Sequence, residues 1–182
     1  DLKSKIILIS GPTASGKSKA ALKIAKKLNG EIINADSMQV YKELNILTAR
    51  PSKTDLNKID HHLYGFRSVK KEFSSGEWLK LAKKNIKKIR DKNKIPVLVG
   101  GTGLYFKALT DGLVKIPKIP IQIRNKIRQM QNNLGQKKFY LKLLKIDPLV
   151  KNRIDPTDVQ RSIRAYEAVS YTHLRAHETD LN

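Results

Sequence analysis

The stretch Ile6-Ile-Leu-Ile-Ser10 runs directly into Gly11-Pro-Thr-Ala-Ser-Gly-Lys-Ser18, and the fold class is inferred from this junction. A short, wholly apolar run predicts a buried β-strand. Over residues 21–28, apolar side chains then recur at i, i+3, i+4 and i+7, the spacing of one helix face. A strand, a glycine loop and a helix in this order are the setting of a G-x-x-x-x-G-K-[ST] phosphate-binding loop.

The loop is expected to bind phosphate along its whole length. Two of its residues, Gly11 and Gly16, can adopt backbone angles closed to other residues, so consecutive N–H groups can point into one concavity at the positive end of the helix dipole. Lys17 adds a mobile positive charge, and the Ser18 hydroxyl can hold a Mg²⁺ ion that bridges phosphate oxygens. The motif therefore predicts a di- or triphosphate site with Mg²⁺ as cofactor, formed by Gly11, Pro12, Thr13, Ala14, Ser15, Gly16, Lys17 and Ser18.

The composition points to a polyanionic partner. The 182 residues include 37 Lys and Arg against 16 Asp and Glu, a net charge of +21, with a pI of about 10.1. An electrostatic field of this sign and size attracts nucleic acid, although a generally lysine-rich composition of the proteins of the source organism would give the same charge. The chain has no cysteine, and its longest apolar run is far short of the roughly 20 residues of a membrane span. We expect a monomeric cytoplasmic protein without membrane association.

Two further strands are expected, at residues 31–35 and 95–99, with an amphipathic helix at about 77–92 between them. The first delivers Asp36 at its end and the second ends at Gly100-Gly-Thr-Gly103, and loops at such carboxyl ends carry the chemistry of α/β proteins. Glycine stands where a hydrolysing ATPase usually has its Walker-B aspartate, which disfavours an ATPase motor. Residues 1–115 are therefore predicted to form an α/β core, a P-loop NTPase-like parallel sheet flanked by helices.

The remainder is expected to form a small basic helical insertion and a return helix. Residues 116–150 begin with a proline hinge at 116–120 and continue as helices at about 121–134 and 136–146, separated by Gly135. This insertion suits a lid or a clamp for a polyanion. Residues 151–169 should return to the core in a helix that starts near Asp155-Pro156. Residues 170–182 contain no lysine and show no clean apolar period, so we expect a foreign or artefactual tail.

The adjacent His61 and His62 lack the i, i+4 spacing of a zinc site, which favours structural roles.

Taken together, these motifs resemble the tRNA dimethylallyltransferases (tRNA isopentenyltransferases). Similarity covers about residues 5–169 in the family's order, with Leu47 where the family usually has glycine. Family members continue past residue 169, so the resemblance implies a C-terminally truncated member. The matching stretches are Gly-Pro-Thr-Ala-Ser-Gly-Lys-Ser (11–18), Ala-Asp-Ser-Met-Gln-Val-Tyr (35–41), Thr-Ala-Arg-Pro (48–51), His-His-Leu (61–63), Pro-Val-Leu-Val-Gly-Gly-Thr-Gly-Leu-Tyr (96–105) and Asp-Val-Gln-Arg-Ser-Ile-Arg-Ala (158–165).

The resemblance implies transfer of a dimethylallyl group from dimethylallyl diphosphate to N6 of the adenosine next to the anticodon on its 3′ side, in tRNAs reading codons that begin with U. The loop would then hold a diphosphate leaving group, stabilised by Lys17, by Ser18 with Mg²⁺ and by Arg164. Asp36 would take the proton of the amine, and Thr102 would lie beside both reactants. The anticodon stem–loop of the tRNA, with its adenosine flipped out of the stack, would contact Asp36, Ser37, Met38, Gln39, Thr102, Arg124, Gln160, Arg161, Ser162, Ile163 and Arg164.

Other functions remain open at this point. An adenylate isopentenyltransferase would use the same donor with a free nucleotide, a nucleotide kinase shares the loop, and an inactive truncated fragment could bind nucleic acid through charge alone. The individual residues also have simpler interpretations. Asp36 could cap a helix or bind Mg²⁺ indirectly, Thr102 could satisfy a turn, and Arg161 and Arg164 could form surface ion pairs.

Overall fold

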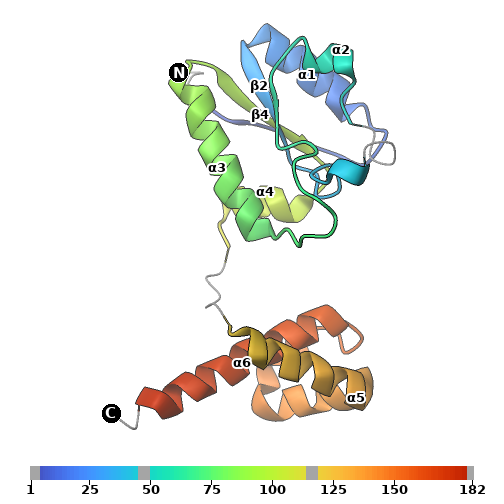
Figure 1. Cartoon of the computed structure of the whole chain (residues 1–182), viewed down its shortest axis with the longest axis vertical. Helices are drawn as coiled ribbons and strands as arrows, with labels where there is room; N and C mark the ends of the chain where they lie inside the picture. The colour runs from blue at the N-terminus through green and yellow to red at the C-terminus, as the bar shows by residue number, and fades with distance from the viewer. Residues whose placement is uncertain (1–4, 45–49, 114–118, 180–182) are drawn as a thin grey trace. The chain divides into compact units, whose positions relative to one another are not determined.

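The computed structural model describes residues 5–44, 50–113 and 119–179. The chain divides into two compact units, unit 1 (Asp1–Leu113) and unit 2 (Val114–Asn182) (Figure 1). Each unit has its own core of buried hydrophobic side chains. Unit 1 ends close to residue 115, where the sequence predicts the end of the α/β core. Leu47 and most of the expected hinge at 116–120 lie outside the described residues.

Unit 1 is built on a four-stranded parallel sheet with the order β1-β4-β2-β3. Every residue of the two central strands is buried, because helices cover both faces, whereas β1 at the edge exposes alternate residues. The predicted parallel sheet flanked by helices is therefore confirmed, together with the three predicted strands; only the short edge strand β3 was not predicted. The strands are β1 (Ile7–Ser10), β2 (Gly30–Asn34), β3 (His61–His62) and β4 (Ile95–Gly100).

Helices pack on both faces of this sheet (Figure 1). On one face, Ala21 and Ala25 of α1 pack against Ile32 and Val97. On the other face, α3 and α4 meet the sheet, and Trp78 stacks on Tyr105 with ring centroids 4.2 Å apart. The helical segments of unit 1 are α1 (Lys17–Lys27), the 3-10 turn η2 (Lys42–Leu44), α2 (Lys53–Leu56), α3 (Ser75–Asp91) and α4 (Gly103–Thr110).

The long helix α3 begins two residues before the predicted start, because a capping box fixes its first turn. The Ser74 hydroxyl accepts from the Glu77 N–H at 3.2 Å, and the Glu77 carboxylate accepts from the Ser74 N–H at 3.0 Å. Its apolar stripe (Trp78, Ala82, Ile86, Ile89) is buried against the sheet as the sequence predicts.

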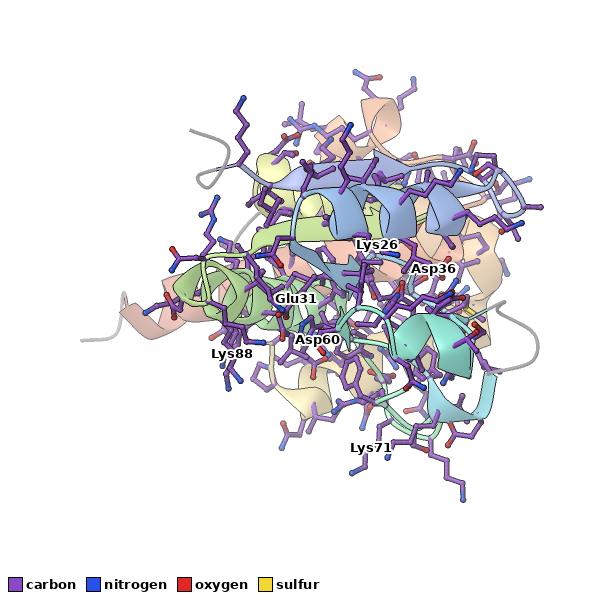
Figure 2. The ribbon with its side chains drawn as sticks, turned by 90° about the horizontal axis from the view of Figure 1, so that it is seen from above. Lys26, Glu31, Asp36, Asp60, Lys71 and Lys88 are labelled. Carbon is purple, nitrogen blue, oxygen red and sulfur yellow. The ribbon has the colours of Figure 1, made fainter. Side chains whose placement is uncertain are left out.

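A buried carboxylate lies at the amino end of β2 (Figure 2). Glu31 is fully buried and accepts hydrogen bonds from Lys94 Nζ at 2.8 Å, Lys92 Nζ at 2.9 Å and His62 Nε2 at 2.7 Å. Burial alone would raise the pKa of Glu31, but these hydrogen bonds outweigh it and lower the pKa to about 2. His62 therefore holds a structural position beside Glu31, in agreement with the structural role predicted for the two histidines.

Unit 2 is helical and contains α5 (Ile121–Ile146), the 3-10 turn η3 (Pro148–Asn152) and α6 (Val159–Thr179). Gly135 has φ 71° and ψ 164°, so α5 consists of two helices joined at the predicted break. The apolar stripe of α6 packs on α5, where Ile163 meets Ile127 and Phe139. The expected return of residues 151–169 to the P-loop core stays a prediction.

The start of α6 differs from the prediction. Asp158, three residues after the expected cap, accepts the N–H of Arg161 at 2.9 Å and so caps the helix. Asp155 instead accepts the N–H of Thr157 at 2.8 Å in a turn of its own. The helix then continues to Thr179, and the foreign origin expected for residues 170–182 stays a prediction. Among the described residues, no helix combines the length and apolarity needed to cross a membrane.

Candidate functional site

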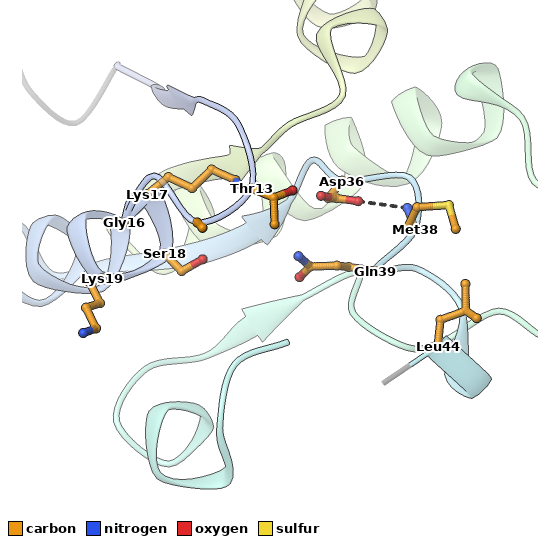
Figure 3. A pocket seen from close by; sticks show the side chains of 10 residues that line it. Thr13, Gly16, Lys17, Ser18, Lys19, Asp36, Met38, Gln39 and Leu44 are labelled. Carbon is orange, nitrogen blue, oxygen red and sulfur yellow. Dashed lines mark hydrogen bonds between the residues drawn. The ribbon is translucent and has the colours of Figure 1, made fainter. Parts of the chain in front are cut away.

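A cavity of about 520 Å³ lies at the carboxyl ends of β1 and β2 in unit 1 (Figure 3). The phosphate-binding loop and the start of α1 form one side of it, and the segment that follows β2 forms the other. Residues from these segments thus meet in one space, although they are separated in sequence. The lining residues are Thr13, Ala14, Gly16, Lys17, Ser18, Lys19, Asp36, Met38, Gln39 and Leu44.

The loop holds its shape through backbone angles and local bonds. Gly16 has φ 79° directly before α1, in the left-handed region that favours glycine. The Lys17 ammonium donates to the Pro12 carbonyl at 2.8 Å across the loop. Within the part of the chain that the structure describes, no side chain caps α1, and the first turn of α1 contains no acidic residue. The N–H groups of that turn can therefore bind an anion. The loop therefore has the geometry and charge of a phosphate site.

Asp36 faces the same cavity from the end of β2 (Figure 3). Its Oδ1 accepts from the N–H of Met38 at 2.9 Å, which fixes the orientation of the carboxylate. A methyl group built on Gly101 would lie 3.8 Å from Asp36 Oδ2 and 3.4 Å from the Gly11 carbonyl oxygen. The carboxylate and the first glycine of the loop thus lie against the same residue. The structure thus brings Asp36 and Lys17 to one cavity.

Asn34, which the sequence analysis missed, holds the Asp36 backbone in place. Its side-chain oxygen accepts from the Asp36 N–H at 2.9 Å, and its amide donates to the carbonyls of Asp36 at 2.9 Å and Leu63 at 3.0 Å. The Asn34 carbonyl in turn accepts from the Trp78 indole at 2.8 Å. Asn is uncommon in a buried strand and readily bonds to the backbone two residues on, so its position before Asp36 was the available signal.

Thr102 is not among the residues that line the cavity. Its hydroxyl accepts from the Ser37 N–H at 2.9 Å and donates to the Ser37 hydroxyl at 3.2 Å. Its own N–H donates to the Ala35 carbonyl at 3.2 Å. Thr102 therefore ties the loop after β4 to the turn that carries Asp36, the turn-forming role that remained open. Met38 and Gln39 line the cavity as expected, and Lys19 and Leu44 were not predicted.

The other predicted RNA-binding residues belong to unit 2. Gln160, Arg161 and Arg164 are exposed on α6, and the side chain of Arg124 on α5 is 37 % exposed. Ser162 and Ile163 are buried instead, because they lie on the side of α6 that packs on α5. The Ser162 hydroxyl donates to the Asp158 carbonyl at 2.7 Å. Both side chains are therefore buried in unit 2, and the contact of these two residues with RNA stays a prediction.

The loop also fits a magnesium ion bound together with phosphate. The described residues contain no group of three or more His, Cys, Asp or Glu side chains that could form a metal cage. Mg²⁺ does not need one, since it usually keeps several waters and binds one or two protein oxygens together with substrate phosphates. Ser18 in the cavity can supply such an oxygen.

Comparisons with known proteins identify the family of this chain. The family model described as IPP transferase matches residues 39–180. The chain is 64% identical over 178 residues to a tRNA dimethylallyltransferase of Pelagibacter ubique, covering 98% of this chain and 57% of the relative. It is 48% identical over 166 residues to one of Allorhizobium ampelinum, covering 91% of this chain and 55% of the relative. The chain thus spans about half the length of the curated relatives it matches.

Solved structures show the same relationship. A structure described as a eukaryotic dimethylallyltransferase acting on tRNA matches with a TM-score of 0.77 and 30% identity, covering 92% of this chain and 44% of that chain. The tRNA isopentenylpyrophosphate transferase of Bacillus halodurans matches with a TM-score of 0.59 and 37% identity, covering 91% and 55%. Since the family model also matches well over half of the sequence, the chain belongs to the IPP transferase family.

Proposed function

We propose that this chain carries the active centre of a tRNA dimethylallyltransferase. The enzyme transfers the dimethylallyl group of dimethylallyl diphosphate to N6 of the adenosine 3′-adjacent to the anticodon, in tRNAs that read codons beginning with U. The observation that carries this proposal is the single cavity lined by Lys17, Ser18 and Asp36. A phosphate cradle and a carboxylate facing one space suit the transfer of a group from a diphosphate to an amine.

The loop would bind the diphosphate of the donor. The N–H groups at the start of α1 and the Lys17 ammonium would face the departing oxygens, and the Ser18 hydroxyl with phosphate oxygens would hold Mg²⁺. Bound Mg²⁺ would neutralise charge that develops on the leaving diphosphate. An allylic carbon loses diphosphate with cationic character, so stabilising the departing anion is the main catalytic contribution. Arg164 is proposed to add a further positive charge.

Asp36 would act on the acceptor. The N6 amine is a weak nucleophile because its lone pair is delocalised into the purine ring. Its nitrogen forms a bond to the allylic carbon while the bond from that carbon to the diphosphate oxygen breaks. The amine loses one proton, which the Asp36 carboxylate can accept. The bond from Met38 N–H to Oδ1 fixes the carboxylate and directs Oδ2 to the side of Gly101 and Gly11.

The acceptor would be a nucleotide extruded from the anticodon loop, because a stacked base cannot enter such a cavity. Met38 and Gln39 are available in the cavity to contact it, and Ser37 lies beside them. Unit 2 would bind the RNA backbone through its exposed cations. Besides Arg161 and Arg164 on α6, the cations of α5 are Arg124, Lys126, Arg128, Lys137, Lys138, Lys142 and Lys145.

The test is a transfer assay with the full chain. Mg²⁺, labelled dimethylallyl diphosphate and unmodified tRNA are incubated, and the RNA is digested and analysed for N6-alkylated adenosine. Label in that nucleoside supports the proposal. Label in free AMP would identify an adenylate isopentenyltransferase, and phosphate transfer from ATP would identify a kinase. Salt-sensitive tRNA binding without any transfer would leave an inactive nucleic-acid-binding fragment.

A further inference from the structure

Unit 2 contains a buried carboxylate between two arginines. Glu167 of α6 has a side chain that is only 4% exposed, and it lies against α5. Its Oε2 is 3.7 Å from Arg124 Nε, and its Oε1 is 3.8 Å from Arg128 Nε. The two arginines are one helical turn apart and share a face of α5. One buried negative charge therefore holds two positive side chains from the neighbouring helix.

Both arginines approach Glu167 through Nε, which is the inner nitrogen of the guanidinium group. Among the described residues, their terminal Nη groups form no hydrogen bond, and the arginine side chains are 37% and 52% exposed. Buried Glu167 Oε1 and Arg124 Nε also lack hydrogen-bond partners within the described part of the chain. The ion pairs thus hold the Nε atoms of both arginines by charge and leave the terminal Nη groups of both guanidinium groups available to a ligand.

This arginine pair adjoins residues expected to contact RNA. Gln160, Arg164 and Glu167 follow one another on α6 at i, i+4 and i+7, so they share one face of that helix. Gln160 and Arg164 are exposed, whereas Glu167 is buried beneath its two arginines. The same face of α6 therefore leads from the predicted RNA contacts to the arginine pair.

We propose that Arg124 and Arg128 together bind backbone phosphates of RNA, and that Glu167 is the residue that positions them. This inference rests on the proposed function in that the bound RNA is the tRNA substrate. A guanidinium fork matches a phosphate group with two parallel N–H bonds, and a fork held in place loses less conformational freedom when it binds. The proposed function already counts Arg124 and Arg128 among the cations of α5 that bind RNA; the new element is that Glu167 pairs the two arginines and positions them.

The direction in which one substitution changes RNA affinity separates a positioning role of Glu167 from a general electrostatic effect. Glu167→Gln removes a negative charge and almost no volume. If only the field of the protein matters, this variant binds RNA more tightly, since the net charge becomes more positive. If Glu167 positions the arginines, the variant binds RNA more weakly despite the added positive charge.

The experiment measures fluorescence anisotropy of a labelled, unmodified tRNA anticodon stem–loop with the full chain over a series of salt concentrations. We expect Glu167→Gln to weaken binding by about tenfold, because two phosphate contacts are loosened. The matched control is Asp147→Asn, which removes the same charge from unit 2 and keeps the side-chain oxygen that caps Leu149. We expect this control to bind as tightly as the wild type or more tightly. Circular dichroism shows whether the helices of each variant are intact.

A second pair of variants leaves the buried carboxylate untouched. Arg128→Lys preserves charge but removes the fork, and we expect it to weaken binding severalfold. Arg128→Ala should reduce the slope of log affinity against log salt by about one, the loss of one phosphate contact. Lys126→Ala removes a charge from an exposed position on the same helix, and we expect a smaller change in that slope.

Three results would overturn the inference: unchanged or tighter binding by Glu167→Gln, wild-type affinity of Arg128→Lys, or no RNA binding by the wild-type chain. The readout is binding alone, so it separates this inference from the proposed function. A chain that binds RNA in this way but transfers no dimethylallyl group refutes only the function. A chain that transfers the group while Glu167→Gln binds more tightly refutes only the arginine pair.

Discussion

The buried Glu31 cluster predicts how the stability of unit 1 depends on pH. Burial opposes ionisation of Glu31, but hydrogen bonds from Lys94, Lys92 and His62 lower its pKa from 4.5 to about 2. A carboxyl group whose pKa is lower in the folded state stabilises that state above its unfolded pKa. The contribution is therefore present above pH 4.5 and is lost as the pH falls toward 2. At 1.36 kcal/mol for each pKa unit, it amounts to about 3 kcal/mol.

The perturbation is Glu31→Gln, measured by urea unfolding between pH 7 and pH 2.5. Trp78 is the only tryptophan in the sequence and is buried in the core of unit 1, so its fluorescence reports the unfolding of that unit. We expect the variant to be about 3 kcal/mol less stable than the wild type at pH 7. The difference should shrink below pH 4.5, because the unfolded chain then takes up a proton on Glu31 that the folded protein takes up only near pH 2.

Two stability curves that stay parallel down to pH 2.5 would contradict this role of the Glu31 charge. A constant difference would mean that Glu31→Gln acts through packing and not through the charge of Glu31. The control is Glu72→Gln, which removes an exposed carboxylate from the same unit. This control should lie within about 0.5 kcal/mol of the wild type at every pH.

Two further substitutions test the frame around the cavity. A methyl group at Gly100 would lie 2.1 Å from the Ala35 backbone, so Gly100→Ala should destabilise unit 1 by about 3 kcal/mol or more in the same urea assay. The control is Gly76→Ala in the first turn of α3, where the nearest atom to the added methyl group is 3.9 Å away. This control should be neutral or slightly stabilising. Asn34→Asp keeps the shape of the side chain but loses its two amide N–H donors beside Asp36. It should lower the stability of unit 1 by about 2 kcal/mol and reduce dimethylallyl transfer. Wild-type stability and transfer would contradict the role of Asn34 in holding the Asp36 backbone.

The sequence predicts those parts of the molecule that depend on local patterns. The loop at 11–18 and the apolar strands around it require nothing beyond adjacent residues, and Gly135 breaks α5 through its own backbone freedom. Parallel strands place their carboxyl ends at one edge, which is why Asp36 could be expected near the loop before its position was known.

The parts that were missed depend on contacts between distant residues. Asn34 forms hydrogen bonds with Leu63 and Trp78, and Glu31 forms ion pairs with the lysines that precede β4. Neither role can therefore be predicted from the residues next to Asn34 or Glu31 in the sequence. Ser162 and Ile163 match the family's motif, but their burial is decided by α5. Residue type alone also cannot predict whether Asp155 or Asp158 caps α6, because both positions carry the same side chain.

In the proposed reaction, one cavity serves the donor and the acceptor with separate residues. The most direct test of this arrangement compares Lys17→Ala and Asp36→Ala in the full chain, with calorimetric titration of dimethylallyl diphosphate in Mg²⁺ and label transfer to unmodified tRNA. We predict that Lys17→Ala weakens donor binding about tenfold or more, the loss of a charge-assisted hydrogen bond. We predict that Asp36→Ala binds the donor as the wild type does but transfers no label. Retained transfer by Asp36→Ala, or unchanged donor affinity in Lys17→Ala, would contradict the account.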